Sequence, residues 1–353
     1  MPRPIQVHID QNALANNLHI ARRATRSRIM AAIKGDAYGH GLLRAAEALA
    51  GADGFAVLDI RDAVRLREAG YGQTMLLLEG CFQADELQLV AEYDLSCVIH
   101  RAGQIAMLDA YPGRAALDVW LKVNTGMNRL GCVPAAVAPA MERLRAHQAV
   151  REITLMTHFS CADEARGVAD QLEVFNNLAG AYRVPRSAAN SAALLRYPDT
   201  HGDWVRPGIM LYGASPFADT SAQQLGLRPA MTLRSEIIAI QELAAGDEVG
   251  YGALFRADRT MRIGIVACGY ADGYPRHAPN GTPVLVDGQL APIVGRISMD
   301  MLSVDLSGVP HATVGSRVVL WGEGIPVENV ARAAGTISYE LLCGLTKRVP
   351  VHL

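Results

Sequence analysis

The stretch that decides the fold is RIMAAIKGDAYGHGLLRAAEALAGADGFAVL, residues 28–58. It starts with a short apolar run at Ile29–Ile33 and passes through small residues. An apolar pattern at helical spacing then covers Leu42–Ala50, and a second apolar run follows at Gly54–Leu58. Two strand-like runs joined by one helical pattern predict a βα unit, in which the two strands are parallel neighbours.

This unit repeats as far as Gly213, with further helical patterns over Arg61–Ala69, Pro139–Ala146 and Ala165–Ala181. Eight apolar runs qualify as strands: Ile29–Ile33, Gly54–Leu58, Met75–Leu78, Leu95–Ile99, Leu117–Val123, Ile153–Met156, Arg186–Ala189 and Val205–Leu211. Eight such units predict an α/β fold with an N-terminal (β/α)8 barrel of the TIM type. No GxGxxG follows any of these strands, which disfavours an open sheet that binds a dinucleotide.

The pattern changes after about Leu225, where helical periodicity fades and turn signals such as Asn280-Gly281 separate short β-rich runs. These runs are Ile237–Ile240, Met261–Cys268, Pro283–Val286, Pro292–Val294, Leu302–Val304, Val318–Leu320 and Val349–Leu353, interrupted by helical stretches at Val327–Ala334 and Tyr339–Leu345. We expect a barrel over residues 1–225 and a mainly antiparallel β domain over residues 226–353. The run Ile5–Ile9 is a candidate for pairing with the second domain.

The composition favours small-molecule partners. The 353 residues carry 33 basic and 35 acidic side chains, a balance that creates no long-range field to attract nucleic acid or anionic lipid. No run of eighteen apolar residues occurs, and Met1–Asp10 contains no apolar segment typical of a signal peptide. We therefore expect a cytoplasmic protein without nucleic-acid or membrane partners. The six cysteines show no CxxC spacing, which argues against a zinc site and a disulfide framework.

Lysine is rare in this chain. Of the 33 basic residues only Lys34, Lys122 and Lys347 are lysines. An arginine cannot lose its proton or form an imine, whereas a desolvated lysine can do both. Codon bias could leave a few surface lysines, and Lys347 fits that interpretation. Lys34 and Lys122 differ from it because each lies at the end of a predicted strand.

The carboxyl ends of barrel strands form the active site in this fold, so the residues after each strand are the candidates. Lys34 follows the first strand, Lys122 and Arg129 the fifth, His158 the sixth and Arg206 the eighth. Desolvation at the barrel mouth lowers the pKa of a lysine, and a neutral amine can condense with an aldehyde. A lysine that merely extends from a strand end is the alternative.

An anion site is expected beside these residues. Asn190 and Ser191 follow the seventh strand and open a short helical run, and Gly208 and Ile209 lie near the eighth. The loops after strands seven and eight form the recurrent phosphate site of this fold. A phosphate site together with an imine-forming lysine indicates pyridoxal 5'-phosphate as cofactor, and no metal.

These motifs resemble those of the alanine racemase family, pyridoxal-phosphate enzymes that interconvert L- and D-alanine. The segment Lys34–Gly41 is similar to the family's cofactor-lysine signature, and the matches extend to Tyr339. The resemblance implies a barrel, a C-terminal β domain, and a head-to-tail homodimer whose active sites are each completed by the partner subunit.

The resemblance also implies individual roles. Lys34 would hold the cofactor as an internal aldimine and act as one acid/base, and Tyr251 would be the second base, reaching the other subunit's cofactor. Two bases on opposite faces of the substrate Cα are what racemisation needs. His158 and Arg206 would form a hydrogen-bonded chain leading to Tyr251, with Arg206 facing the pyridine nitrogen.

The remaining roles concern the phosphate and the substrate. Phosphate contacts are implied for Tyr38, Ser191, Gly208, Ile209 and Tyr339, with Asn190 beside them. Arg129 and the backbone of Met299 would bind the substrate carboxylate, and Lys122 corresponds to a lysine that relatives often carry as a carbamate. Tyr270 and Tyr274 resemble entrance residues, with structural packing as an equal alternative.

Three alternatives stay open. A broad-specificity amino-acid racemase would use the same scaffold with a different pocket size. A decarboxylase of basic amino acids has a related architecture, but the Tyr251 motif and Arg206 speak against it. A non-catalytic carrier of the cofactor would resemble the barrel alone. The sequence leaves undecided whether the D-alanine feeds cell-wall (peptidoglycan) synthesis or the enzyme serves D-alanine breakdown.

Overall fold

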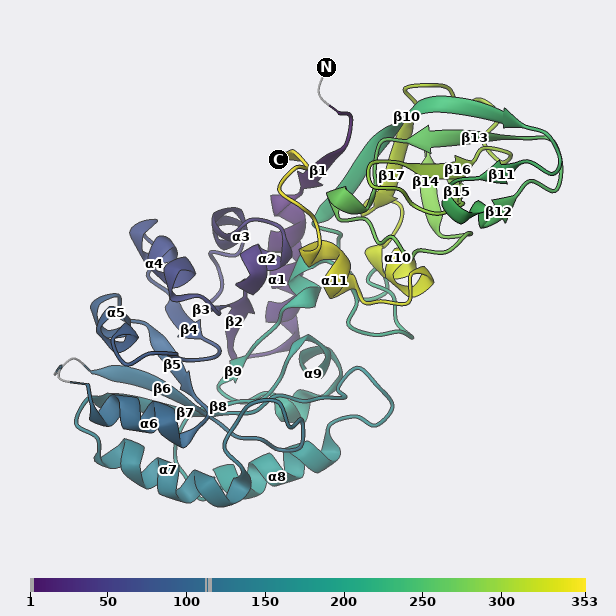
Figure 1. Ribbon diagram of the computed structural model, residues 1–353. Helices are drawn as coiled ribbons and strands as arrows, with labels where there is room; N and C mark the ends of the chain where they lie inside the picture. Colours follow the sequence, from purple (N-terminus) through teal and green to yellow (C-terminus); the bar gives the residue numbers. More distant parts are fainter. Residues whose placement is uncertain (1–2, 112, 114–115) are drawn as a thin grey trace.

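The computed structural model describes residues 3–111, 113 and 116–353 of the chain. It consists of a barrel surrounded by helices and a β-rich part, which lies at the upper right of Figure 1. The first residues that the structure describes and the C-terminal end of the chain lie near the junction of the two parts (Figure 1).

In the described residues, eight parallel strands close into a barrel in chain order. They are β2 (Arg28–Ala32), β3 (Gly54–Val57), β4 (Thr74–Leu77), β5 (Ser96–Ile99), β6 (Leu117–Lys122), β7 (Val150–Met156), β8 (Arg186–Ser187) and β9 (Trp204–Val205). The barrel closes where β2 pairs with β9, with Ile29 opposite Val205. The predicted (β/α)8 barrel is therefore confirmed.

The inside of the barrel is filled by side chains. They form one buried cluster, made of Met30, Ala56, Leu76, Val98, Trp120, Met156 and Trp204. Their strand neighbours face the surrounding helices, as the two-residue period of a strand requires. Gly54 leaves the room that Met30 needs, because a Cβ at Gly54 would lie 2.7 Å from the Met30 sulfur. The barrel is thus packed below its mouth, which leaves only the strand ends open for a site.

The predicted strand Val205–Leu211 is wrong beyond its first residue. Strand β9 ends at Val205, and Ile209–Tyr212 forms a 3-10 helix, η2. Pro207 has no N–H to donate to a neighbouring strand, and Gly208 leaves the extended conformation, with φ −126° and ψ −91°. All four side chains of η2 are buried, which explains why the run looks like a buried strand in the sequence.

Helices cover the outside of the barrel (Figure 1). They are α1 (Gln11–Ala24), α3 (Leu42–Ala48), α4 (Ile60–Glu68), α5 (Glu86–Glu92), α6 (Ala102–Asp109), α7 (Pro134–Ala146), α8 (Ala169–Ala179) and α9 (Ser191–Arg196), followed by the 3-10 turn η1 (Pro198–Thr200). The segment labelled α2 (Lys34–Tyr38) lies instead at the mouth of the barrel, and its backbone is not that of a right-handed helix. Asp10, Asp59 and Asn190 cap α1, α4 and α9 by accepting backbone N–H groups. The predicted helix at Pro139–Ala146 starts earlier, because Pro134 and not Pro139 occupies its first turn.

The β-rich part is one sheet with two small additions. Its strands are β1 (Gln6–Ile9), β10 (Met231–Leu243), β13 (Met261–Val266), β14 (Pro283–Val286), β15 (Gln289–Val294), β16 (Leu302–Asp305), β17 (Arg317–Trp321) and β18 (Val351–His352). Their order is β13-β16-β15-β14-β17-β10-β1-β18, and β13 also pairs with β10. The additions are a hairpin of β11 (Glu248–Val249) and β12 (Phe255–Arg256), and the helices α10 (Val327–Ala333) and α11 (Ser338–Cys343).

The sheet is mainly antiparallel, as predicted, and β1 lies within it. β1 pairs antiparallel with β10, where Gln6 is opposite Arg234, and parallel with β18, where Val7 is opposite Val351. The last strand is shorter than the predicted Val349–Leu353. The domain boundary between residues 225 and 226 stays a prediction.

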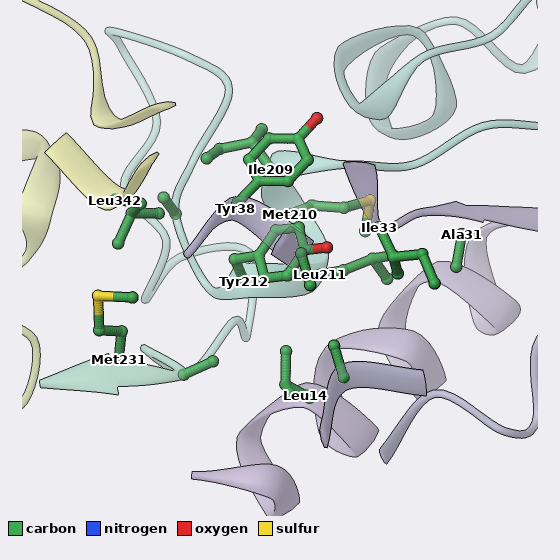
Figure 2. Packing of buried hydrophobic residues seen from close by; sticks show 14 of the residues in the cluster. Leu14, Ala31, Ile33, Tyr38, Ile209, Met210, Leu211, Tyr212, Met231 and Leu342 are labelled. Carbon is green, nitrogen blue, oxygen red and sulfur yellow. The ribbon is translucent and has the colours of Figure 1, made fainter. Parts of the chain in front are cut away.

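Helix α11 packs on the barrel mouth. Figure 2 shows Leu342 and Met231 close to the aromatic rings of Tyr38 and Tyr212, which lie one against the other. The two rings are stacked with centroids 4.5 Å apart. The backbones are equally close, because a Cβ at Gly39 would lie 2.3 Å from the Leu342 carbonyl oxygen. The β-rich part therefore forms one wall of the barrel mouth.

Candidate active site

A cavity of about 730 Å³ opens at the carboxyl ends of the barrel strands. Its wall is made of residues that end or follow the strands, and of Tyr339 and Cys343 from α11. The lining residues are Ala32, Lys34, Gly35, Tyr38, Ala56, Leu58, Leu78, Glu79, Phe82, His100, Lys122, Arg129, Leu130, Met156, His158, Asn190, Ser191, Arg206, Gly208, Ile209, Tyr339 and Cys343. Four of these side chains are cationic and one, Glu79, is a carboxylate, so the cavity suits an anionic ligand.

The cavity brings together most of the site residues predicted from the sequence. Those that line it are Lys34, Tyr38, Lys122, Arg129, His158, Asn190, Ser191, Arg206, Gly208, Ile209 and Tyr339. Tyr251 and Met299 do not line it. Both belong to loops of the β-rich part, and their exposed fractions are 71% and 52%.

Lys34 begins a turn of left-handed backbone. Gly35, Asp36, Ala37 and Tyr38 have φ values of 63°, 51°, 54° and 53°. Only the first of these residues is a glycine, and the left-handed conformation costs the others about 1–2 kcal/mol each. Hydrogen bonds close the turn, from Ala37 N to Ile33 O at 2.9 Å and from Gly41 N to Asp36 O at 2.9 Å. Strain of this kind persists where the surroundings over-determine the backbone, and it is concentrated at functional sites.

Two lysine amines share the cavity, and both have a lowered pKa. Burial, and then the Arg129 guanidinium, lowers the pKa of Lys34. Burial, followed by Arg206 and Arg129, lowers the pKa of Lys122 to about 8. Glu79 opposes both shifts by favouring the charged amines. Each lysine therefore reaches its neutral, nucleophilic form more easily than an exposed lysine does.

Arg206 is held rigidly on the cavity wall. Its Nη1 donates to Ser187 Oγ at 2.6 Å, and its Nη2 donates to Thr157 O at 2.6 Å. Nη2 also lies 3.4 Å from His158 Nδ1. Burial lowers the pKa of Arg206 to about 10, so the guanidinium stays protonated at neutral pH. Burial, and then Arg206, brings the pKa of His158 well below its ordinary value, which leaves a neutral imidazole whose Nδ1 accepts from Arg206.

Ser191, Tyr38 and Gly208 form a small cradle on the cavity lining. The Ser191 hydroxyl oxygen accepts the Gly208 N–H at 2.8 Å, so its own proton is free to be donated to a ligand. A Cβ at Gly208 would lie 2.6 Å from the Tyr38 hydroxyl oxygen. Only glycine lets the Tyr38 hydroxyl approach the backbone this closely. Helix α9 has only six residues, so we attribute anion binding here to these hydroxyl groups and not to a helix dipole.

Sequence reasoning missed Glu79 and His100, although the rule that found Lys34 could have found them. They follow β4 and β5 closely, as Lys34 follows β2. Burial, and then Lys122, lowers the pKa of His100. Cys343 had no such signal, because α11 reaches the mouth only through the packing of the β-rich part. A Cβ at Gly35 would lie 3.9 Å from its sulfur.

The loop that carries Met299 is hydrogen-bonded to a neighbouring loop of the β-rich part, the one that carries Tyr270. Tyr270 N donates to Ser298 O at 3.1 Å and Ala271 N to Met299 O at 3.0 Å, so the Tyr270 loop supports the Met299 loop. Tyr270 is 38% exposed, whereas Tyr274 is buried and stacks on Trp321. Of the two roles considered for Tyr274, structural packing fits this chain.

Two features are absent from the residues that the structure describes. No group of three or more His, Cys, Asp or Glu side chains could hold a metal ion there. In the same part of the chain, no helix combines the length and the apolar character that crossing a bilayer requires.

Comparisons with known proteins agree with this geometry. Residues 9–216 match the family described as alanine racemase, N-terminal domain, and residues 230–353 match the alanine racemase C-terminal domain. The alanine racemases of Nitrosospira multiformis and Nitrosomonas eutropha are 63% and 58% identical to the chain, each over 99% of both proteins. The crystal structure of the biosynthetic alanine racemase from Pseudomonas aeruginosa has a TM-score of 0.97 and 49% identity to the chain. The structure of alanine racemase from Acinetobacter baumannii has a TM-score of 0.93 and 39% identity, and each comparison covers 99% of both chains. The resemblance seen in the sequence is confirmed, and the chain belongs to the alanine racemase family.

Proposed function

We propose that this chain interconverts L-alanine and D-alanine. The observation that carries the proposal is Lys34, an amine of lowered pKa placed in a cationic cavity at the mouth of the barrel. The relatives named above supply the choice of alanine as substrate.

The residues of the cavity fit pyridoxal 5'-phosphate. The cradle brings the Ser191 hydroxyl, which accepts from Gly208 N, and the Tyr38 hydroxyl close to one stretch of backbone on the cavity lining, and two such donors suit a phosphate. Lys34 offers the amine that joins the cofactor's aldehyde. Asn190, Ile209 and Tyr339 line the same wall and complete the proposed phosphate contacts. When bound, the cofactor withdraws electrons from the substrate Cα and so makes its proton acidic.

Two residues move the proton at Cα in this proposal. Lys34 Nζ exchanges it on one face of the substrate, and the partner subunit's Tyr251 exchanges it on the other. The phenol of Tyr251 ordinarily has a pKa near 10, so it needs a donor to support its charged form. The neutral His158 accepts from Arg206 at Nδ1, which leaves its other ring nitrogen protonated and able to donate to that phenol.

Arg206 restrains side reactions. It is proposed to face the pyridine nitrogen of the cofactor, where a guanidinium that keeps its proton has no lone pair to offer and no proton to give up. Its bonds to Ser187 and Thr157 prevent it from turning away. An unprotonated pyridine withdraws electrons less strongly, which disfavours transamination.

Arg129 and the Met299 backbone of the partner are proposed to bind the substrate carboxylate. Arg129 lines the cavity and is exposed, with its guanidinium available to a carboxylate. A carbamate on Lys122 would supply an anion that orients it. Glu79 is the carboxylate of the cavity lining, and its charge acts on the amines of Lys34 and Lys122.

We propose a homodimer with shared sites, and the exposed positions of Tyr251 and Met299 support it. Both side chains are exposed in one chain, as are Leu254 and Met301, at 53% and 43%. Exposed apolar side chains on loops that carry functional residues are typical of an interface. We also propose a cytoplasmic location, supported by six cysteines without a disulfide, four of them buried.

The test combines an activity assay with a chemical label. Purified protein is incubated with L-alanine and optical rotation is followed; in parallel, borohydride reduction is followed by peptide mapping. We expect racemisation and a single pyridoxyl label on Lys34. Lys34→Ala should show neither. A label on another residue, or turnover of lysine as fast as of alanine, would refute this assignment.

A further inference from the structure

The left-handed turn after Lys34 must be stabilised by neighbouring groups. Asp36, Ala37 and Tyr38 all have positive φ values, and the turn connects two residues of the cavity, Lys34 and Tyr38. Residues without special freedom adopt this backbone only when neighbouring groups fix it. Asp36 is fixed from one side, because its Oδ1 accepts the Leu42 N–H at 2.8 Å.

His40 fixes the other side of the turn. Its Nδ1 lies 3.0 Å from Ala37 O and 2.9 Å from Tyr38 O. Both partners are carbonyl oxygens, which only accept, so Nδ1 carries the proton and donates to them. The residue is completely buried, and its Nε2 has no hydrogen-bond partner among the described residues. Buried polar atoms are normally hydrogen-bonded, and in this imidazole only Nδ1 is. The hydrogen-bonding contribution of His40 is therefore the donor at Nδ1.

The imidazole also supports the aromatic stack beneath the cradle. Its ring centroid lies 4.6 Å from that of Tyr212, and Tyr212 stacks on Tyr38 (Figure 2). The Tyr212 hydroxyl donates to Ala32 O at 2.8 Å, at the end of the strand that leads to Lys34. One buried unit of His40, Tyr212 and Tyr38 therefore joins the strand end, the turn and the phosphate cradle.

We propose that His40 is a positioning residue: its Nδ1–H fixes the left-handed turn, and the turn fixes Lys34 and Tyr38 toward the cofactor. This inference rests on the proposed function. It assigns a task to a residue that does not line the cavity and touches neither substrate nor cofactor.

The test uses three substitutions that differ in where they place a donor. In His40→Asn the amide nitrogen can occupy the place of Nδ1, in His40→Gln it reaches the place of Nε2, and His40→Leu has no donor. The matched control is His201→Leu, which removes a bond from His201 Nε2 to Leu194 O, 2.9 Å long, at the opposite end of the barrel.

Three quantities are measured on the purified holoenzymes: hydrogen exchange, cofactor loss and kcat. Hydrogen exchange of the peptide covering residues 34–41 reports the turn itself and needs no assumption about function. The rate at which hydroxylamine strips the cofactor reports the hold on Lys34. We expect the Gln and Leu substitutions to speed both the hydrogen exchange and the loss of the cofactor. They should also lower kcat about 10- to 100-fold, because a reacting group misplaced by about 1 Å costs a factor of this order. Asn should stay within about threefold of the unchanged protein in all three.

The outcomes separate the two claims. If His40 only filled space, the Leu variant would behave most like the unchanged protein and the Asn variant would differ strongly from it. That result would overturn the assignment of His40. The assignment would also be overturned if the turn loosened in the Gln or Leu variant without faster loss of the cofactor. An unchanged protein that carries no cofactor on Lys34 contradicts the proposed function instead, and the exchange data still decide whether His40 holds the turn.

Discussion

The Arg3 guanidinium binds both carboxylate oxygens of Asp272, at 2.8 and 3.1 Å, although 269 positions separate the two residues. Arg348, near the other chain end, donates from Nε to Oδ1 at 2.7 Å, and Gly269 N donates to Oδ2 at 2.9 Å. Burial alone would raise the pKa of Asp272, but the hydrogen bonds from Arg3, Gly269 and Arg348 outweigh it and hold the pKa below its ordinary value. A buried anion thus ties both chain ends to the Tyr270 loop.

Asp272→Asn should destabilise the protein by about 2–3 kcal/mol. The substitution leaves two arginines facing a neutral amide, and hydrogen bonds to charged groups contribute about 1.5–3 kcal/mol each. Solvent screens part of this loss, because both arginine side chains are 39% exposed. The measurement is urea unfolding at pH 7.5 and fixed protein concentration.

Glu248→Gln is the control for Asp272→Asn. It breaks the pair of Glu248 with Arg256, whose side chains are 47% and 67% exposed, and should cost less than about 1 kcal/mol. Equal losses in the two variants would mean that the Asp272 network contributes no more than a surface ion pair.

The barrel was predictable because its strands are buried on both faces and its helices on one, and both leave periodic patterns. Pairs such as Ile29 with Val205 follow once eight units are recognised. The same periodicity fails at η2, where four buried residues imitate a strand. A proline without an N–H at position 207 was the signal against a strand there.

The site was predictable where it depends on strand ends, as at Lys34, Lys122 and Arg206. The left-handed turn was not, because Asp36, Ala37 and Tyr38 have no intrinsic preference for positive φ and only the packing around them selects it. Contacts across most of the chain, such as Arg3 with Asp272, leave no local pattern either.

Shared active sites predict that two inactive variants restore each other. Lys34→Ala lacks the covalent anchor and Tyr251→Phe lacks the second base, so each homodimer should be inactive. A mixed dimer contains one site with both defects and one with neither. Mixing equal amounts under conditions that allow subunit exchange should recover about a quarter of the activity of the unchanged protein, because half of the dimers are mixed and each of these has one intact site of its two.

The control for this complementation mixes Lys34→Ala with Arg206→Ala. Both residues line the same cavity of one chain, so in a mixed dimer each of the two sites carries one defect. No recovery in the Tyr251 mixture despite proven exchange would show that Tyr251 acts within its own chain. Recovery in the control would show instead that Lys34 and Arg206 do not serve the same site.

Lys122 should bind carbon dioxide as a carbamate. Its pKa of about 8 leaves about a quarter of the amine neutral at pH 7.5, against about one in a thousand for an ordinary lysine. The neighbouring Arg129 and Arg206 favour the resulting anion. Protein equilibrated with 13C-bicarbonate should give one carbamate signal by NMR, absent from Lys122→Arg and retained in Lys347→Arg. A signal that follows Lys347 would place the reaction on the surface lysine.

Acid should weaken the fold through His40. Burial, acting against the hydrogen bonds to Tyr38 and Ala37 and aided by the charge of Arg44, lowers its pKa from 6.5 to about 4. Between these two values the unfolded chain binds a proton that the folded chain excludes, so stability falls as the pH falls below 6.5 and is unaffected by this group above it. From pH 7.5 to 5.5 the loss in the free energy of unfolding is about 1.4 kcal/mol.

The His40→Asn variant cannot bind this proton. Its free energy of unfolding should therefore fall by about 1.4 kcal/mol less than that of the unchanged protein between pH 7.5 and 5.5. The measurement is urea unfolding at both pH values and fixed protein concentration. Equal pH dependence in the two proteins would mean that His40 accepts its proton in the folded chain and that its ring does not stay neutral beneath the Lys34 turn.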